Sequence, residues 1–93
     1  MESPPPELAQ QLRDANHAGV ELQITDLDLG LTLLDRADTT TDAEIARRNR
    51  QNARKAFETV RHFLTKLTPT AEQQSRLDER LPRLQQRLDD AGA

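Results

Sequence analysis

The chain contains no cysteine, tryptophan or tyrosine, and its only aromatic residues are two phenylalanines. The absence of cysteine excludes disulfides and thiolate metal sites, and it removes the usual indicator of the redox compartment. No apolar run approaches the roughly 18 residues that cross a bilayer. The first ten residues hold neither a basic nor an apolar region, so no signal peptide is predicted. We therefore expect a soluble cytoplasmic protein that does not bind membranes.

The length of 93 residues corresponds to a single domain with a thin core. Leu, Ile, Val and Phe make up just over a fifth of the chain, and the formal net charge is only −3. This composition lies on the folded side of the boundary with intrinsic disorder. Residues 1–6 contain three consecutive prolines and are expected to form a flexible leader, which leaves residues 7–93 as the domain.

The segment 41–67 has the longest uninterrupted helical pattern, with apolar residues spaced three and four apart. Thr41, followed three residues later by Glu44, predicts a capping box at its start. Both phenylalanines lie in this segment. So do seven of the thirteen Lys and Arg residues. We expect this helix to form the spine of the core.

Two shorter helices are predicted before the long one. Residues 7–18 form a marginal helix that Gly19 is expected to end. Residues 20–23, where apolar and polar side chains alternate, read as a linker or as the lead-in to the next helix. Residues 25–38 form the next helix, in which Gly30 indicates a close backbone approach.

The last predicted helix covers residues 70–89. Thr70 and Gln73 form a capping box, and leucines at heptad-like spacing continue through the segment. Pro82 should kink this helix without dividing it, because the leucine register is kept across the proline. Short connections make neighbouring helices antiparallel. The predicted fold is an all-α antiparallel three-helix bundle with helices at about 25–38, 41–67 and 70–89, and with 7–18 as a further short helix.

Basic residues follow helical rows. One row lies on the long helix: Arg47, Arg50, Arg54 and Arg61. Another lies on the last helix: Arg76, Arg80, Arg83 and Arg87. Such rows can track a phosphate backbone. The competing interpretation is that they pair with acids of the same chain, such as Asp28, Asp35 and Asp38. The acidic pI of about 5.3 and the lack of spare aromatics favour this pairing over a nucleic-acid partner.

Residue types that carry catalysis or bind metals are sparse. The two histidines, His17 and His62, have no metal-ligand spacing. Asp26 and Asp28 lack the glycine and glutamate of a calcium loop and fit a helix start. No phosphate-binding loop or nucleophile motif is found. We predict no catalytic residue, no metal site, no cofactor and no enzymatic activity.

Three leucines fall on the side of the 25–38 helix opposite to its main apolar stripe: Leu22, Leu29 and Leu33. An apolar second face is either covered within the fold or used for a partner. Leu8 and Leu12 of the first segment are the candidates for internal cover. The other outcome makes Leu22, Leu29 and Leu33 a partner-binding site.

Residues 52–64, NARKAFETVRHFL, are followed by a turn and a second amphipathic helix. The spacing of Ala53, Ala56, Phe57 and Val60 resembles a hairpin of the tetratricopeptide-repeat type. Three helices over residues 24–90 also resemble microtubule-interacting-and-transport domains. No 34-residue repeat recurs in the chain. Both resemblances imply a helical scaffold that binds a peptide or helix in a groove.

The resulting functional hypothesis is a non-enzymatic helical protein–protein interaction module, which either self-associates or binds another protein's helix. The alternative is a nucleic-acid or anionic-surface binder that uses Arg47, Arg50, Arg54 and Arg61.

Overall fold

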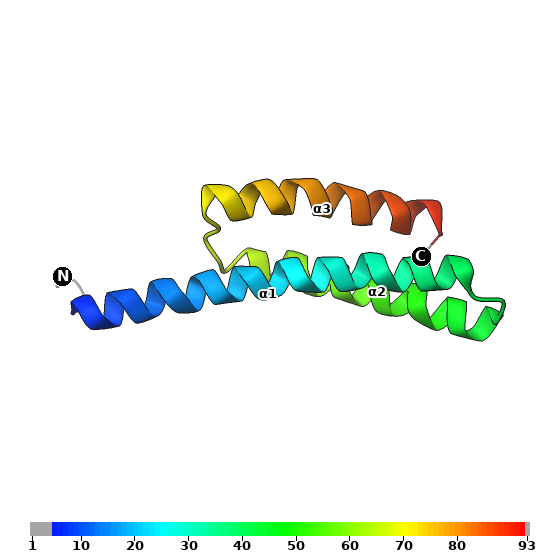
Figure 1. Cartoon of the computed structure of the whole chain (residues 1–93), viewed down its shortest axis with the longest axis horizontal. Coiled ribbons are helices and arrows are strands. Elements are labelled where there is room, and N and C mark those ends of the chain that lie inside the picture. Colours follow the sequence, from blue (N-terminus) through cyan, green and yellow to red (C-terminus); the bar gives the residue numbers. More distant parts are fainter. Residues whose placement is uncertain (1–4, 93) are drawn as a thin grey trace.

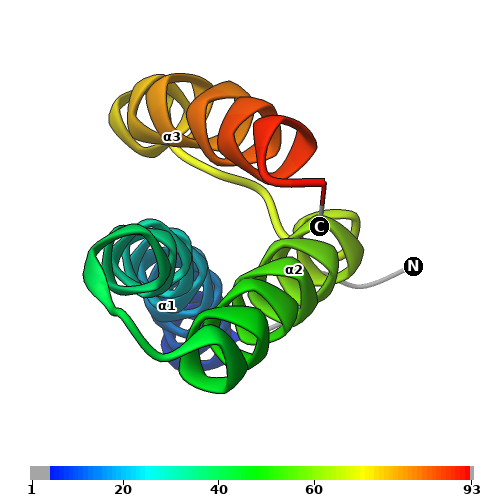
Figure 2. The same ribbon diagram turned by 90° about the vertical axis from the view of Figure 1, so that its right-hand side faces the viewer.

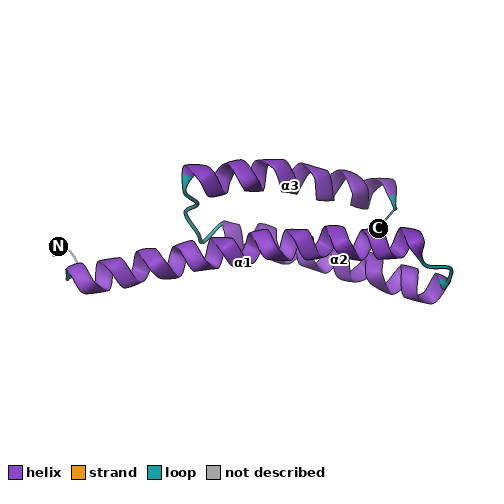
Figure 3. Cartoon of the chain, viewed as in Figure 1, coloured by secondary structure: helices purple, strands orange, loops and turns teal. Residues whose placement is uncertain are grey.

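The computed structural model describes residues 5–92 as three helices with no strand among them. The helices are α1 (Pro6–Thr39), α2 (Ala43–Leu64) and α3 (Ala71–Asp90). They run up, down and up, with α1 and α2 forming a hairpin and α3 lying over one side of it (Figures 1 and 3). The predicted all-α three-helix bundle is confirmed. Residues 1–4 of the predicted leader lie outside the described part of the chain.

The first helix is continuous where we predicted two helices and a linker. Gly19 does not end a helix: its missing side chain lets the segment that follows α2 approach, since a Cβ there would lie 3.1 Å from Leu67 Cδ2. Val20, Gln23 and Ile24 are all buried, at the spacing of a helix face. The alternation that indicated a linker was thus part of a helical pattern with a period near 3.6.

The turn between α1 and α2 corrects a second prediction. The N-cap of α2 is Asp42, whose carboxylate accepts hydrogen bonds from the backbone N–H groups of Glu44 and Ile45. Thr41 therefore does not cap the helix. Aspartate caps at least as well as threonine, and its charge also suits the positive end of the helix dipole.

The start of α3 was predicted correctly. Thr70 and Gln73 form the reciprocal capping box, in which each side chain accepts from the other residue's backbone N–H. Pro82 lies inside α3, which remains one helix from Ala71 to Asp90. Pro6 occupies the first helical position of α1, where its missing N–H costs no hydrogen bond.

The core lies between the three helices and begins at Val20 on α1. Its buried apolar residues are Val20, Ile24, Leu27 and Leu34 from α1, Ala53, Phe57 and Val60 from α2, and Leu77, Leu84 and Leu88 from α3. Most contacts of α1 are with α2, fewer are with α3, and α2 and α3 contact each other least. In end view, α3 covers one side of the hairpin and leaves the opposite side open (Figure 2).

Gly30 marks the close approach that the sequence indicated. A Cβ at this position would lie 2.9 Å from Leu84 Cδ2 and 3.8 Å from the Ala53 carbonyl oxygen. The absence of a side chain therefore lets all three helices converge at one level of the bundle.

The molecule is elongated because α1 is longer than its neighbours. At about 1.5 Å per residue, the 34 residues of α1 extend for about 51 Å. α2 has 22 residues and α3 has 20. The N-terminal part of α1 projects beyond both (Figure 1). The radius of gyration is 16.4 Å, against about 12 Å for a compact chain of this length.

Leu27 and Leu29, two residues apart on α1, allow a buried position to be compared with a surface position. We expect Leu27→Ala to lower the free energy of unfolding by about 2–5 kcal/mol, because Leu27 is fully buried and its truncation leaves a cavity. The matched change Leu29→Ala, at a half-exposed side chain, should cost less than about 1 kcal/mol. Urea denaturation at low protein concentration measures both, and equal losses would contradict the described core.

Candidate functional site

The most conspicuous surface feature is a set of leucines on α1 that we call the outer leucines: Leu8, Leu12, Leu22, Leu29 and Leu33. Leu22 is 58% exposed and Leu29 is 50% exposed. Large apolar side chains that remain this open on several turns of one helix are a common mark of a contact surface.

The direction of the outer leucines follows from their chain neighbours. Glu21 and Asp28 bind arginines of α3, so their side chains point toward α3. Leu22 and Leu29 come one residue later, which turns each of them about 100° further round the helix. They therefore lie away from α3, on the open side of the bundle.

The remaining outer leucines divide into two groups. Leu33 is partly buried and packs against the core, so it belongs only to the margin of this surface. Leu8 and Leu12 are 44% and 56% exposed. Leu8 and Leu12 do not cover Leu22 and Leu29, which was one of the two predicted outcomes, because all four leucines lie on one continuous helix.

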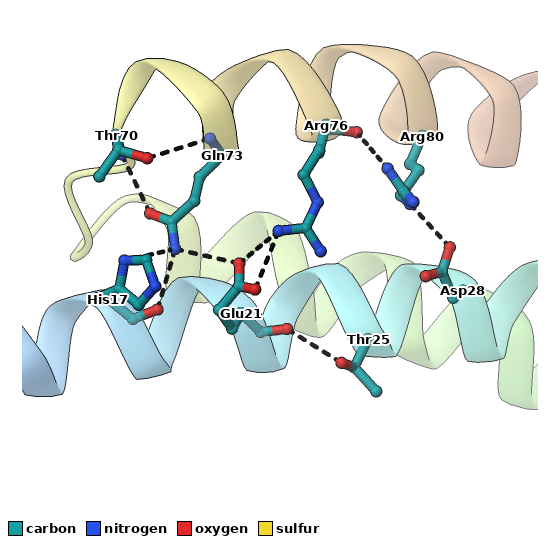
Figure 4. A network of polar contacts seen from close by, with 8 residues as sticks. All are labelled: His17, Glu21, Thr25, Asp28, Thr70, Gln73, Arg76 and Arg80. Carbon is teal, nitrogen blue, oxygen red and sulfur yellow. Dashed lines mark hydrogen bonds and ion pairs between the residues drawn. The ribbon is translucent and has the colours of Figure 1, made fainter.

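A polar network joins α1 to α3 opposite the open side (Figure 4). The buried Gln73 amide donates to the His17 carbonyl oxygen (3.1 Å) and to Glu21 Oε2 (3.2 Å), and lies 3.2 Å from His17 Nδ1. Arg76 Nη1 donates to both Glu21 carboxylate oxygens, at 2.9 and 2.8 Å. The hydrogen bond from Arg76, followed by that from Gln73, holds the pKa of Glu21 below its usual value.

Two further ion pairs continue this seam along α3. Arg80 Nε lies 2.8 Å from Asp28 Oδ1, and Arg87 reaches Asp35 at 2.6 Å and Asp38 at 3.2 Å. The predicted pairing of arginine rows with acids of the same chain is thus realised by the α3 row. Since each acid holds its carboxylate toward α3, the seam also fixes the rotation of α1 in the bundle.

The α2 arginine row has different surroundings. Arg47 forms its ion pair with Glu44 of its own helix, and this contact lowers the pKa of Glu44. The guanidinium carbon of Arg61 lies 5.7 Å from the centroid of the Phe57 ring, within cation–π range. Arg47 therefore pairs with an acid of its own helix, where we expected a partner on α1.

Part of this row lines a surface hollow beside the end of α3. The lining residues are Arg47, Arg50, Gln51, Arg54, Lys55, Ala91 and Gly92. The hollow thus gathers three of the four arginines predicted as an anion-binding row, and Arg61 is not part of its lining. Lys55, which the sequence interpretation placed outside the row, joins the hollow. The sequence carried no signal for this addition, because it depends on where the end of α3 lies.

The described residues offer little for other kinds of site. Between residues 5 and 92 no three His, Asp or Glu side chains gather where they could hold a metal ion. His17 belongs to the Gln73 network, and His62 packs edge-on against Phe63 with ring centroids 5.5 Å apart. No described helix combines the length and apolarity needed to cross a membrane.

The Glu21–Arg76 contact gives an acid-dependent contribution to stability. Because the folded-state pKa of Glu21 is depressed, this contribution is present above the unfolded pKa near 4.5 and is lost as the pH falls through the folded value. We expect Glu21→Gln to destabilise the protein at pH 7 and to have a much smaller effect near pH 3. Thermal unfolding across this pH range tests it, with Glu58→Gln at an exposed acid of α2 as control. A loss that is independent of pH would contradict the assignment.

Comparisons of the chain with protein-family models, with curated proteins and with solved structures find no match.

Proposed function

We propose that this protein is a non-enzymatic helical interaction module that uses the open side of α1 to bind a helix of another polypeptide chain. The observation that carries the proposal is the exposure of Leu22 and Leu29 on the side of α1 turned away from α3. This mode of binding also agrees with the groove-binding scaffold implied by the resemblance to tetratricopeptide-repeat and microtubule-interacting-and-transport domains.

The ion-pair seam adds a second argument for this proposal. The acids of α1 that lie beside α3 are occupied by Arg76, Arg80 and Arg87. The seam therefore holds α1 at a fixed rotation and presents the outer leucines on a rigid element. A preorganised surface loses less entropy on binding than a flexible one does.

The available apolar surface sets the scale of affinity. Full burial of a leucine side chain contributes about 1.5–3 kcal/mol, so covering four that are about half-exposed gives roughly 3–6 kcal/mol. Association costs about 4–15 kcal/mol. The four leucines alone would bind weakly, and contacts at the rim of the surface must supply the remainder.

Charge placed on this surface should abolish the interaction. We expect Leu22→Glu with Leu29→Glu to reduce captured partner at least about tenfold, because each carboxylate would have to be desolvated in an apolar contact. Affinity capture of the full chain from its native cells, quantified by mass spectrometry, measures the effect.

The matched control adds the same charges on α3. Ser75→Glu with Gln85→Glu changes two exposed residues of a helix that lies away from the outer leucines. Circular dichroism verifies that both variants stay helical. A set of captured proteins that is the same for the wild type and both variants would refute the role of this surface.

A second candidate function rests on the hollow at the end of α3. Arg47, Arg50, Arg54 and Lys55 bring four cationic side chains around one concave surface, together with the amide of Gln51. Such a grouping suits a phosphate-bearing or other polyanionic ligand. The acidic net charge of the chain counts against this candidate as the main function.

Salt dependence tests this candidate. If three or four phosphates contact the hollow, affinity for a fluorescent single-stranded oligonucleotide should fall roughly 20- to 50-fold between about 50 and 200 mM salt. Arg50→Gln with Lys55→Gln should remove this binding, whereas Arg83→Gln, at an exposed position of α3, should not. Anisotropy that is unchanged at low salt would rule out the candidate.

A further inference from the structure

We propose that the partner of the open side is a second copy of this chain, with the two α1 helices packed antiparallel. This inference rests on the proposed function, and it specifies both the partner and the register. It follows from the spacing of the exposed residues, from their order along α1, and from the projection of α1 beyond the rest of the bundle.

The outer leucines belong to a longer stripe with the spacing of a coiled-coil seam. Its eight positions alternate steps of four and three residues: Leu8, Leu12, Ala15, Gly19, Leu22, Asp26, Leu29 and Leu33. We call these residues the outer stripe. The buried face of α1 follows the period of a straight helix, about 3.6 residues. The outer stripe repeats every 3.5 residues, which is the period of helices that wind around one another.

The outer stripe of one copy, read from Leu8 to Leu33, is complementary to the outer stripe of a second copy read from Leu33 to Leu8. Seams of antiparallel helices can pair so that large residues meet large ones at the ends and small ones meet large ones at the centre. The resulting pairs are Leu8 with Leu33, Leu12 with Leu29, and Ala15 with Asp26, each formed twice about the two-fold axis, while Leu22 meets the partner's Gly19 at the place where that copy's Leu67 packs. A C2 contact requires this kind of self-complementarity.

A parallel arrangement fits the same residues poorly. It would place Asp26 directly opposite the partner's Asp26, and two like charges in directly opposed positions repel. In the antiparallel register the two Asp26 residues stand 11 residues apart along the helices, or about 16 Å, which exceeds the Debye length of about 8 Å at physiological salt.

The residues beside the outer stripe also permit a second copy. On the side turned away from α2, the flanking positions recur every seven residues and hold Gln11, Ala18, Thr25 and Thr32. Flanking charges normally select the partner of a coiled coil. Because these flanks are uncharged, two identical copies meet without like-charge repulsion.

The projecting part of α1 gains most from this arrangement. The core begins at Val20, and Leu8 and Leu12 are exposed on turns that lie mainly outside it (Figure 1). A segment of this length is a marginal helix on its own. In the antiparallel dimer it lies along Leu29 and Leu33 of the partner, so each copy covers the end that the other leaves bare.

The size of the contact predicts a reversible dimer. From Leu8 to Leu33 the outer stripe is about 38 Å long, and a helix is about 10 Å wide, so each copy offers roughly 380 Å² of projected face. Together the two faces come to about 800 Å², which is below the roughly 1,200 Å² at which stable specific interfaces begin and falls among weak, transient contacts. We therefore expect a dissociation constant in the micromolar range.

The cysteine-free sequence allows a direct test of the register. We would prepare the full chain as two single variants, Leu12→Cys and Leu29→Cys, mix them, and follow disulfide formation in a glutathione buffer. The mixed 12–29 disulfide should form at least about tenfold faster than the 12–12 or 29–29 disulfides, because like positions lie about 25 Å apart in the antiparallel register. Ser75→Cys, at an exposed position of α3 and mixed with either variant, gives the background rate.

Sedimentation equilibrium of the wild type supplies the second measurement. Mass should rise from monomer toward dimer between about 5 and 500 µM, and Leu22→Glu should abolish this rise. Predominant 12–12 and 29–29 disulfides would overturn the antiparallel register. A wild type that stays monomeric, with all cysteine pairs at the background rate, would overturn self-association. In that case, capture of another protein that is lost on Leu22→Glu with Leu29→Glu would leave the proposed function standing, and no such capture would end both.

Discussion

The structure depends on the packing of one long helix against two short ones. α1 must bury a stripe that begins at Val20, and α2 and α3 together are long enough to cover only that part. Two covering helices also cannot surround a third, so one side of α1 stays open along its whole length (Figure 2). Both the projecting end and the exposed Leu22 and Leu29 follow from this mismatch in length and number.

α2 and α3 differ in how much charged side chains contribute to their contacts with α1. α3 lies closer to α1 than to α2 over most of its length, and besides its core leucines it meets α1 through three arginines that pair with four acids and through the buried Gln73. Solvent-exposed ion pairs are individually weak, but a row of them fixes orientation and register more than it adds stability. α2 packs against α1 mainly through apolar residues, which leaves its arginines to other contacts, including the hollow beside Ala91.

Much of the fold could be predicted from local signals. The capping box at Thr70 and the continuity of α3 through Pro82 depend on residues near in sequence, so their patterns sufficed, and a glycine inside an apolar helix was enough to indicate the close approach at Gly30. The errors occurred where a distant contact overrode a local preference. Gly19 looked like a helix end, but Leu67, in the segment that follows α2, packs where its side chain would be. The exposure of Leu22 and Leu29 was one of two outcomes, and only the continuity of α1 decided between them.

The continuity of α1 also links its folding to association. If Gly19 had ended a helix, residues 7–18 could have turned back to cover the open side, and the chain would have satisfied its own apolar surface. Gly19 instead continues the helix and brings the segment that follows α2 close, so Leu8 and Leu12 are carried away from Leu22 and Leu29. The surfaces that could have closed within one molecule are therefore held apart on one rigid rod. Residues held apart on one helix can still meet across a dimer when α1 of the second copy runs in the opposite direction. The outer stripe in reversed order provides the matching positions.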